Sequence, residues 1–140
     1  MRTGQARQIN ELSREQALEL LGTVSLGRVV FTRNALPAIR PVNHIVDGEA
    51  IIIRSHLGAA IVSHSDGPRG AVVAYEADNL DPDAHLGWSV IVTGTAHIIR
   101  EPAAIARYER LLRPWVAREM DYVISIHADM ITGIELIPET

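Results

Sequence analysis

The chain contains no cysteine and no lysine among its 140 residues. Without cysteine it can form no disulfide, no thiolate nucleophile and no cysteine-based metal site. Without lysine it has no Schiff-base amine, and all 13 cationic side chains are arginines. Any phosphate or carboxylate that the protein binds through a permanent positive charge must therefore be held by arginine.

Long apolar runs and excess positive charge are also absent. No stretch approaches the roughly 20 apolar residues of a membrane span, and residues 1–13 lack the apolar run of a secretory signal. The formal net charge of −4 argues against a general nucleic-acid binder, which normally presents a basic face. We therefore expect a cytoplasmic protein with no membrane and no nucleic-acid partner.

What the chain does contain is the composition of one ordinary globular domain, with 47% hydrophobic and 21% charged residues. Residues 1–10 are polar, and we expect them to form a flexible N-terminus ahead of a single domain over residues 11–140. The six histidines show no recognised metal-ligand spacing, so we expect no metal site.

The order of predicted elements favours a mainly β, α+β fold. Ser13 and Gln16 have capping-box spacing and begin a short helix that Gly22 closes. A second helix starts at Pro102, and a short helical segment follows Gly58. Strands are predicted over residues 26–33, 36–46, 49–55, 71–77, 87–100, 121–127 and 131–137. Most connections between them are short, which indicates antiparallel pairing in a small closed β-barrel with peripheral helices.

The second strand carries two prolines, Pro37 and Pro41, which cannot donate to a sheet ladder. They indicate an edge strand or a bulge, where a ligand can take over unused backbone partners. Arg40 lies between them and could bind phosphate through two parallel hydrogen bonds. Asn43 could hydrogen-bond the polar edge of a flat heterocycle. Taken alone, Arg40 would be read as an exposed arginine of an edge strand.

Arg54 and Ser55, at the end of the third strand, make a phosphate site the better interpretation. A guanidinium and a hydroxyl stand there just before a turn into the short helical segment. Trp88 and Ser89 start a later strand, where the indole could stack on a planar ring and the hydroxyl could hydrogen-bond it. The alternative for Trp88 is a core position at one end of the barrel.

Three segments, LPAIRPVNHIVDG…IIIRSHLG, AYEAD and GWSVIVTGTAHIIR, resemble those of the pyridoxamine 5′-phosphate oxidase-like family, in particular its short actinobacterial members. The resemblance implies a six-stranded antiparallel split β-barrel that forms a homodimer and binds FMN in two equivalent interface clefts. It implies that the segment with Trp88 reaches the cofactor from the partner subunit. The implied cofactor-binding residues are Arg40, Pro41, Val42, Asn43, Arg54, Ser55, Gly58, Trp88 and Ser89.

The same resemblance implies a flavin-dependent oxidoreductase that transfers hydride to or from a small organic substrate. No side chain stands out as a catalytic acid or base, so we identify no catalytic residue. Ala59 and Ala60 occupy positions where relatives often carry a basic residue. A deazaflavin-dependent reductase on the same fold therefore stays open as an alternative, as does a non-catalytic protein that binds flavin or haem.

Overall fold

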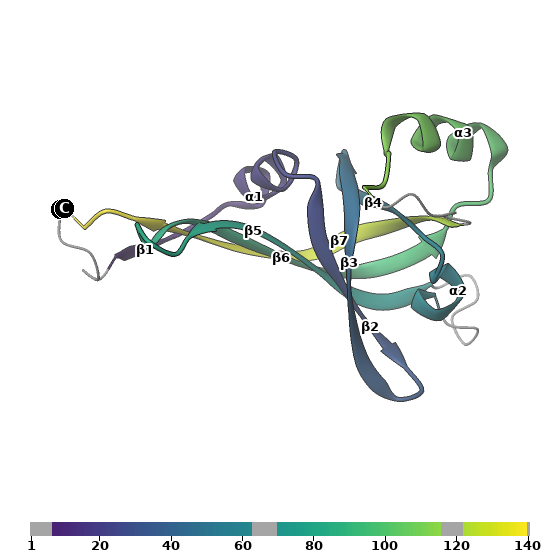
Figure 1. Cartoon of the computed structure of the whole chain (residues 1–140), viewed down its shortest axis with the longest axis horizontal. Coiled ribbons are helices and arrows are strands. Elements are labelled where there is room, and N and C mark those ends of the chain that lie inside the picture. The colour runs from purple at the N-terminus through teal and green to yellow at the C-terminus, as the bar shows by residue number, and fades with distance from the viewer. Residues whose placement is uncertain (1–6, 63–69, 116–121, 140) are drawn as a thin grey trace.

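The computed structural model describes residues 7–62, 70–115 and 122–139, which form an antiparallel sheet curled into a barrel (Figure 1). The sheet order is β1-β7-β4-β3-β2-β5-β6, and an additional β6–β7 pairing closes a ring of six strands. The strands are β1 (Gln8–Glu11), β2 (Leu26–Arg33), β3 (Leu36–Asp47), β4 (Ala50–Ser55), β5 (Ala71–Asp81), β6 (Leu86–Ile98) and β7 (Tyr122–Ile137). The helices are α1 (Arg14–Leu21), α2 (Gly58–Ile61) and α3 (Pro102–Leu111).

This ring confirms the predicted mainly β barrel with peripheral helices. The structure contains one strand that was not predicted, because residues 8–10 belong to β1 and pair with the far end of β7. They are therefore not part of a loose N-terminal segment, whereas residues 1–6 lie outside the described residues. The predicted capping box is present, since Ser13 Oγ accepts the Gln16 N–H and the Gln16 side chain accepts the Ser13 N–H.

The C-terminal half of the sheet is more continuous than the sequence indicates. Residues 122–137 form one strand rather than two, because β7 pairs with β4 at its start and with β6 along most of its length. Residues 78–81 extend β5 beyond the predicted end of this strand at residue 77. These long strands, together with β1, project from the barrel as an arm (Figure 1).

Two hydrophobic clusters hold these elements in place. Alternate residues of the strands point into the barrel, where the buried set includes Val29, Ile51, Ile53, Tyr75 and Val90. A smaller cluster of Ile52, Leu112 and Val123 lies where α3 packs on the outside of β4 and β7. The second cluster fixes the chain that follows α3 against the barrel wall.

The feature that positions the site is the separation of β3 from β4. Residues 44–47 of β3 pair with β4, but residues 36–43 pair with β2 alone. Pro37 and Pro41 both lie in this one-sided half, as their missing amide hydrogens predicted. Beyond the last β3–β4 pair, His44 with Ile53, residues Arg54 and Ser55 of β4 pair with β7. The two strands therefore part and leave an opening between them.

Candidate functional site

A hollow of about 360 Å³ occupies the opening between β3 and β4, a size within the roughly 300–1,000 Å³ range of small-molecule sites. Three segments surround it: residues 40–43 of β3, residues 54–57 at the end of β4 and just after it, and Pro114-Trp115 after α3. Leu26 completes the lining. Six of the nine predicted site residues line this hollow: Arg40, Pro41, Val42, Asn43, Arg54 and Ser55.

Arg54 is the most strongly positioned cation of the hollow. Its side chain is 16% exposed, and Nη2 lies 3.8 Å from a carboxylate oxygen of Glu109. Nη1 donates to the Leu112 carbonyl oxygen at 3.0 Å. The Nε atom is buried and has no hydrogen-bond partner among the described residues. A buried donor without a partner costs roughly 1–3 kcal/mol, so an anion that accepts from this guanidinium would offset an existing penalty.

The β3 wall combines one mobile cation with an apolar surface. Arg40 is exposed, and its Nη1 donates to the adjacent Ile39 carbonyl oxygen at 2.8 Å. Its guanidinium can therefore turn toward a ligand at little cost. Pro41 and half-buried Val42 supply the apolar surface beside it. Together with Arg54, this wall can hold an anionic group at one end of an apolar hollow.

Asn43 and Ser55 shape the backbone around the hollow. Asn43 Nδ2 donates to the Ser25 carbonyl oxygen at 3.0 Å, and Oδ1 accepts the Trp115 N–H at 2.8 Å. Ser55 is buried, and its Oγ accepts the Leu57 N–H at 2.9 Å. Both side chains already hold protein groups, so their contribution to the hollow includes fixing its walls.

Gly58 lies next to the hollow but not in its lining. A Cβ atom at this position would stand 2.3 Å from Cγ of Tyr122. The glycine is therefore needed for close packing of α2 against β7, which gives it a structural reason to be there. Its predicted contact with a cofactor remains a prediction.

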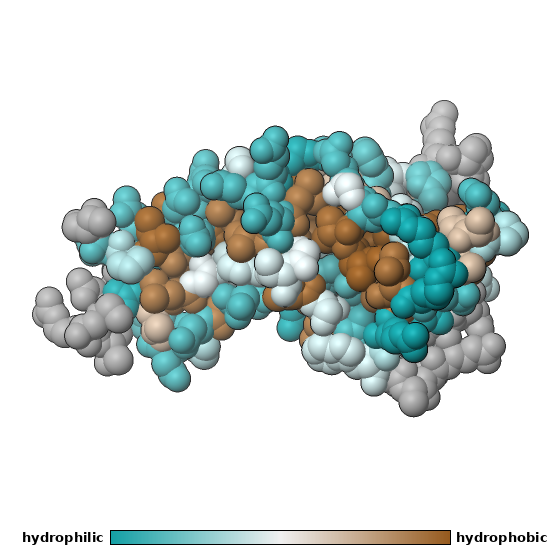
Figure 2. Space-filling view, turned by 90° about the horizontal axis from the view of Figure 1, so that it is seen from above, coloured by the Kyte–Doolittle hydropathy of each residue, from teal (hydrophilic) through white to brown (hydrophobic). Residues whose placement is uncertain are grey.

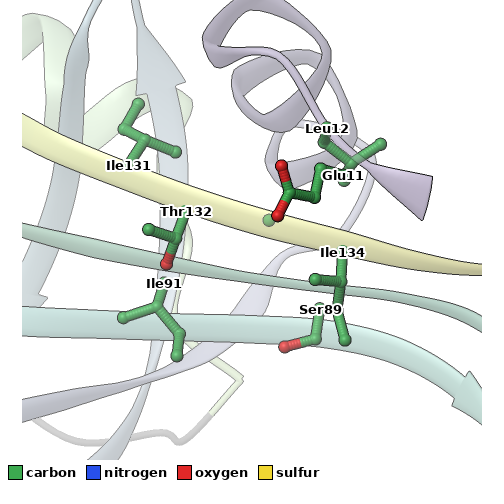
Figure 3. A pocket seen from close by; sticks show the side chains of 8 residues that line it. Glu11, Leu12, Ser89, Ile91, Ile131, Thr132 and Ile134 are labelled. Carbon is green, nitrogen blue, oxygen red and sulfur yellow. The ribbon is translucent and has the colours of Figure 1, made fainter. Parts of the chain in front are cut away.

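Trp88 and Ser89 lie elsewhere in the same chain. Trp88 is 6% exposed and belongs to the barrel core. Ser89 points to the opposite face and lines a second hollow of about 400 Å³ between β1, β6 and β7 (Figure 3). Among the described residues of that lining, Glu11 is the only charged one, and its carboxylate does not suit a phosphate. A contact of Trp88 or Ser89 with a cofactor would have to involve a second subunit.

Sequence reasoning missed Pro114 and Trp115 as lining residues. Trp115 is 68% exposed at the mouth of the hollow, while the tryptophan that the sequence singled out is buried. One available signal was the scarcity of aromatic residues, because the chain has only two tryptophans. The fold was needed to show that the end of α3 returns to β3.

Two titratable groups lie close to the site. Burial lowers the pKa of His44, which keeps this core imidazole neutral. Its Nε2 hydrogen-bonds the Leu21 carbonyl oxygen and its Nδ1 contacts Tyr75 Oη at 2.5 Å. On the outer face, desolvation and then Asp78 raise the pKa of Glu76 to about 7. Arg28 lies 3.2 Å from Glu76 and limits this rise.

Other site types find no support in the described ranges 7–62, 70–115 and 122–139. No group of three or more histidine, aspartate or glutamate side chains there could hold a metal ion. In the same ranges no helix has the length and apolar character to cross a membrane. The hollow between β3 and β4 is therefore the candidate site.

Comparison with known proteins identifies the family of this barrel. The family model described as pyridoxamine 5′-phosphate oxidase matches residues 13–135. An uncharacterised protein of Mycobacterium tuberculosis, Rv0080, is 50% identical over 137 residues, which is 96% of this chain and 90% of that protein.

Two solved structures share the fold over nearly their whole length. A candidate pyridoxamine 5′-phosphate oxidase of Corynebacterium glutamicum is 38% identical with a TM-score of 0.76, covering 91% of this chain and 98% of that one. An FAD-binding protein of Mycobacterium smegmatis is 26% identical with a TM-score of 0.67, at the same coverage. The matched segment includes all nine predicted site residues and confirms the resemblance: the chain belongs to the pyridoxamine 5′-phosphate oxidase-like family of split barrels.

Proposed function

We propose that this protein binds FMN in the hollow between β3 and β4 and acts as a flavin-dependent oxidoreductase on a small organic substrate. The observation that carries the proposal is the Arg54 guanidinium, which is mostly buried beside an apolar hollow and has an unpartnered Nε. The flavin-binding relative of Mycobacterium smegmatis supports flavin as the ligand class.

The residues present fit such a group. Arg54 and Arg40 put two cations for the phosphate in the lining of the hollow. Pro41, Val42 and Leu57 offer apolar contact for the ring system and exclude water from it. Asn43 ties the β3 wall to the Ser25 carbonyl oxygen, and Ser55 fixes the turn at Leu57 on the β4 side. A bound flavin supplies the hydride chemistry, which the protein orients and tunes.

Binding without catalysis is the second candidate. Apart from the two arginines, His56 is the only titratable side chain among the described lining residues, and none of those residues offers a carboxylate as an acid or base. A flavin store or sensor needs only the binding residues. Deazaflavin is the third ligand to test, because it shares the flat ring and the phosphate end with FMN.

The assembly that we propose is a homodimer. The outer face of β3, β2, β5, β6 and β7 carries a row of paired residues: Ile39, Val30, Ala74, Thr93 and Met130. This row contains no charge, and Ile39 and Met130 are 57% and 62% exposed. An uncharged, partly apolar sheet face of this kind is typical of a subunit interface. A second copy on this face would also cover the hollow that contains Ser89.

The test of the ligand uses Arg54→Ala. Losing a charged hydrogen bond of about 1.5–3 kcal/mol should weaken FMN binding about 10- to 100-fold. Riboflavin has the same ring but no phosphate, so its affinity should change little. Dissociation constants from the quenching of flavin fluorescence measure both. Equal losses for the two ligands would contradict a phosphate contact.

The matched control is Arg33→Ala, which removes an exposed arginine from the far end of β2. Its FMN affinity should equal that of the unmodified protein. Absorbance of the purified protein and mass spectrometry of the released ligand then separate FMN, FAD, haem and deazaflavin. A protein that binds none of these would overturn the proposal, and bound flavin that no nicotinamide donor reduces would favour the non-catalytic candidate.

A further inference from the structure

Trp115 is the largest apolar side chain at the mouth of the hollow, and it is 68% exposed. Only 4% of the residues are aromatic, so a solvent-exposed aromatic ring is notable in this protein. Viewed from the side of α1 and α3, apolar surface lies over the barrel as well as along the arm (Figure 2). An exposed indole beside a hollow is therefore a candidate for contact with a ligand.

The Trp115 backbone is fixed rather than loose. Its N–H donates to Asn43 Oδ1 at 2.8 Å, and the same Asn43 amide is anchored on the Ser25 carbonyl oxygen at 3.0 Å. Three residues earlier, Leu112 is buried under α3, and its carbonyl oxygen accepts from Arg54 Nη1. Residues 112–115 are therefore fastened to both walls of the hollow before any ligand binds.

Trp115 also lines a neighbouring hollow. A further hollow of about 360 Å³ shares Leu26 and Trp115 with the first one and is otherwise lined by residues 23–25, Arg28 and Asp78. The indole thus stands at the boundary of two adjoining hollows. Arg54 and Arg40 line only the first hollow, whereas Trp115 lines both.

We infer that Trp115 is the aromatic residue that covers the flat ring of the bound cofactor, and that Asn43 is the residue that positions it. This inference rests on the proposed flavin site. It differs from the sequence-based expectation, in which Trp88 covers the ring and Asn43 contacts it directly. Within one chain Trp88 is buried in the core, and both hydrogen-bonding ends of the Asn43 amide hold protein groups.

The first experiment compares ligands with and without phosphate. Trp115→Ala should weaken FMN and riboflavin about tenfold each, because stacking on the ring is common to both. Trp115→Phe keeps a ring and should recover most of the affinity. This pattern is opposite to that of Arg54→Ala, which affects FMN alone. Unchanged affinity for both ligands in Trp115→Ala would overturn the inference while leaving the flavin site intact.

The second experiment uses the fact that the chain has two tryptophans. In Trp88→Phe, all indole emission comes from Trp115, and acrylamide should quench it strongly in the free protein. Saturating FMN should protect it. Bound flavin should also become more fluorescent in Trp115→Phe than in Trp88→Phe, because an indole in contact with the ring quenches flavin emission. The reverse ranking would assign the ring contact to Trp88.

Asn43 is tested as a positioning residue by a double-mutant cycle. Asn43→Ala should weaken both ligands several-fold and make Trp115 emission in the Trp88→Phe background less anisotropic. Once Trp115 is alanine, replacing Asn43 should cause no further loss. Additive losses would show that Asn43 acts on the ligand independently. Absence of flavin binding by the unmodified protein would instead refute the proposed function itself.

Discussion

At the residue scale, the buried pair of His44 and Tyr75 determines how the core responds to acid. The Leu21 carbonyl oxygen can only accept, so Nε2 of His44 carries the proton and Nδ1 accepts from Tyr75 Oη. A second proton on the imidazole would make Nδ1 a donor as well. Tyr75 would then have to turn its hydrogen toward the Val42 carbonyl oxygen, 3.4 Å away. The native arrangement therefore requires neutral histidine.

We predict that the free energy of unfolding falls as the pH drops below about 6.5. Burial lowers the pKa of His44 from its ordinary value of 6.5 in the folded state, so the unfolded chain binds the proton first. The pKa of Glu76 is raised from 4.5 to about 7 in the folded state, so between these pH values the folded protein binds this proton first. Glu76 therefore increases the free energy of unfolding as the pH falls, which opposes the effect of His44. The measurement is urea unfolding from pH 7 to pH 5 in Glu76→Gln, where this opposing term is absent.

His44→Gln should flatten that dependence in the same background, whereas His85→Asn, which changes an exposed histidine, should preserve it. If His44→Gln does not fold, nitrogen NMR of the imidazole in the unmodified protein gives the answer. The Nε2–H tautomer should persist below pH 6.5. A His44 that titrates at its ordinary pKa would contradict the burial argument.

At the scale of elements, α3 is attached to the β3–β4 turn by a short polar contact. Tyr108 Oη donates to Asp47 Oδ2 at 2.6 Å, and Arg107 Nη1 lies 3.1 Å from the same oxygen. The Tyr108 hydrogen bond, with Arg107 as a smaller contribution, lowers the pKa of Asp47. The contact therefore anchors α3, the helix that leads directly into Leu112 and Trp115.

We predict that Tyr108→Phe lowers the free energy of unfolding by about 0.5–1 kcal/mol, a modest value because Asp47 and Arg107 are solvent-exposed. The Asp47 contribution is present above pH 3.8 and is lost as the pH falls through its lowered pKa, so the variant should depend less on acid. Urea unfolding at pH 7 and pH 3 measures this, and amide exchange in α3 should accelerate.

Arg110→Ala is the control, since it changes an exposed residue of the same helix. It should alter neither the acid dependence nor amide exchange in α3. Equal exchange rates in Tyr108→Phe and the unmodified protein would show that the hydrophobic cluster around Leu112 alone holds the helix.

Elements that are specified by local sequence signals could be predicted from the sequence. The capping box of α1 and the two prolines of β3 are local signals, and each led to the correct element. The Arg40–Asn43 and Arg54-Ser55 segments could be assigned to one hollow because a short hairpin joins them. Trp115 could not, because it reaches Asn43 across 72 residues of sequence. The buried position of Trp88 likewise depends on strand register, since one residue of shift exchanges it with Ser89.

At the scale of the whole molecule, the uncharged row from Ile39 to Met130 leads us to predict a dimer of about twice 15.3 kDa. A charge introduced into this row should be costly, because an unpaired charge in an interface loses its hydration. Met130→Glu should therefore sediment as a monomer with an unchanged circular dichroism spectrum. Leu111→Glu places the same charge on α3, at a residue that is 56% exposed, and should stay dimeric.

The flavin affinity of the Met130→Glu monomer then decides whether the site is shared. Arg54, Arg40 and Trp115 all belong to one chain, so a site that is complete within a subunit should bind FMN as tightly in the monomer. Ser89 lies on the outer face of β6, paired with Ile134 and Asp78, and can approach a second copy. We expect the monomer to lose affinity for both FMN and riboflavin, since the partner would act on the ring rather than the phosphate. A loss confined to FMN would place the partner at the arginine end instead, and an unmodified protein that sediments as a monomer would remove the shared site altogether.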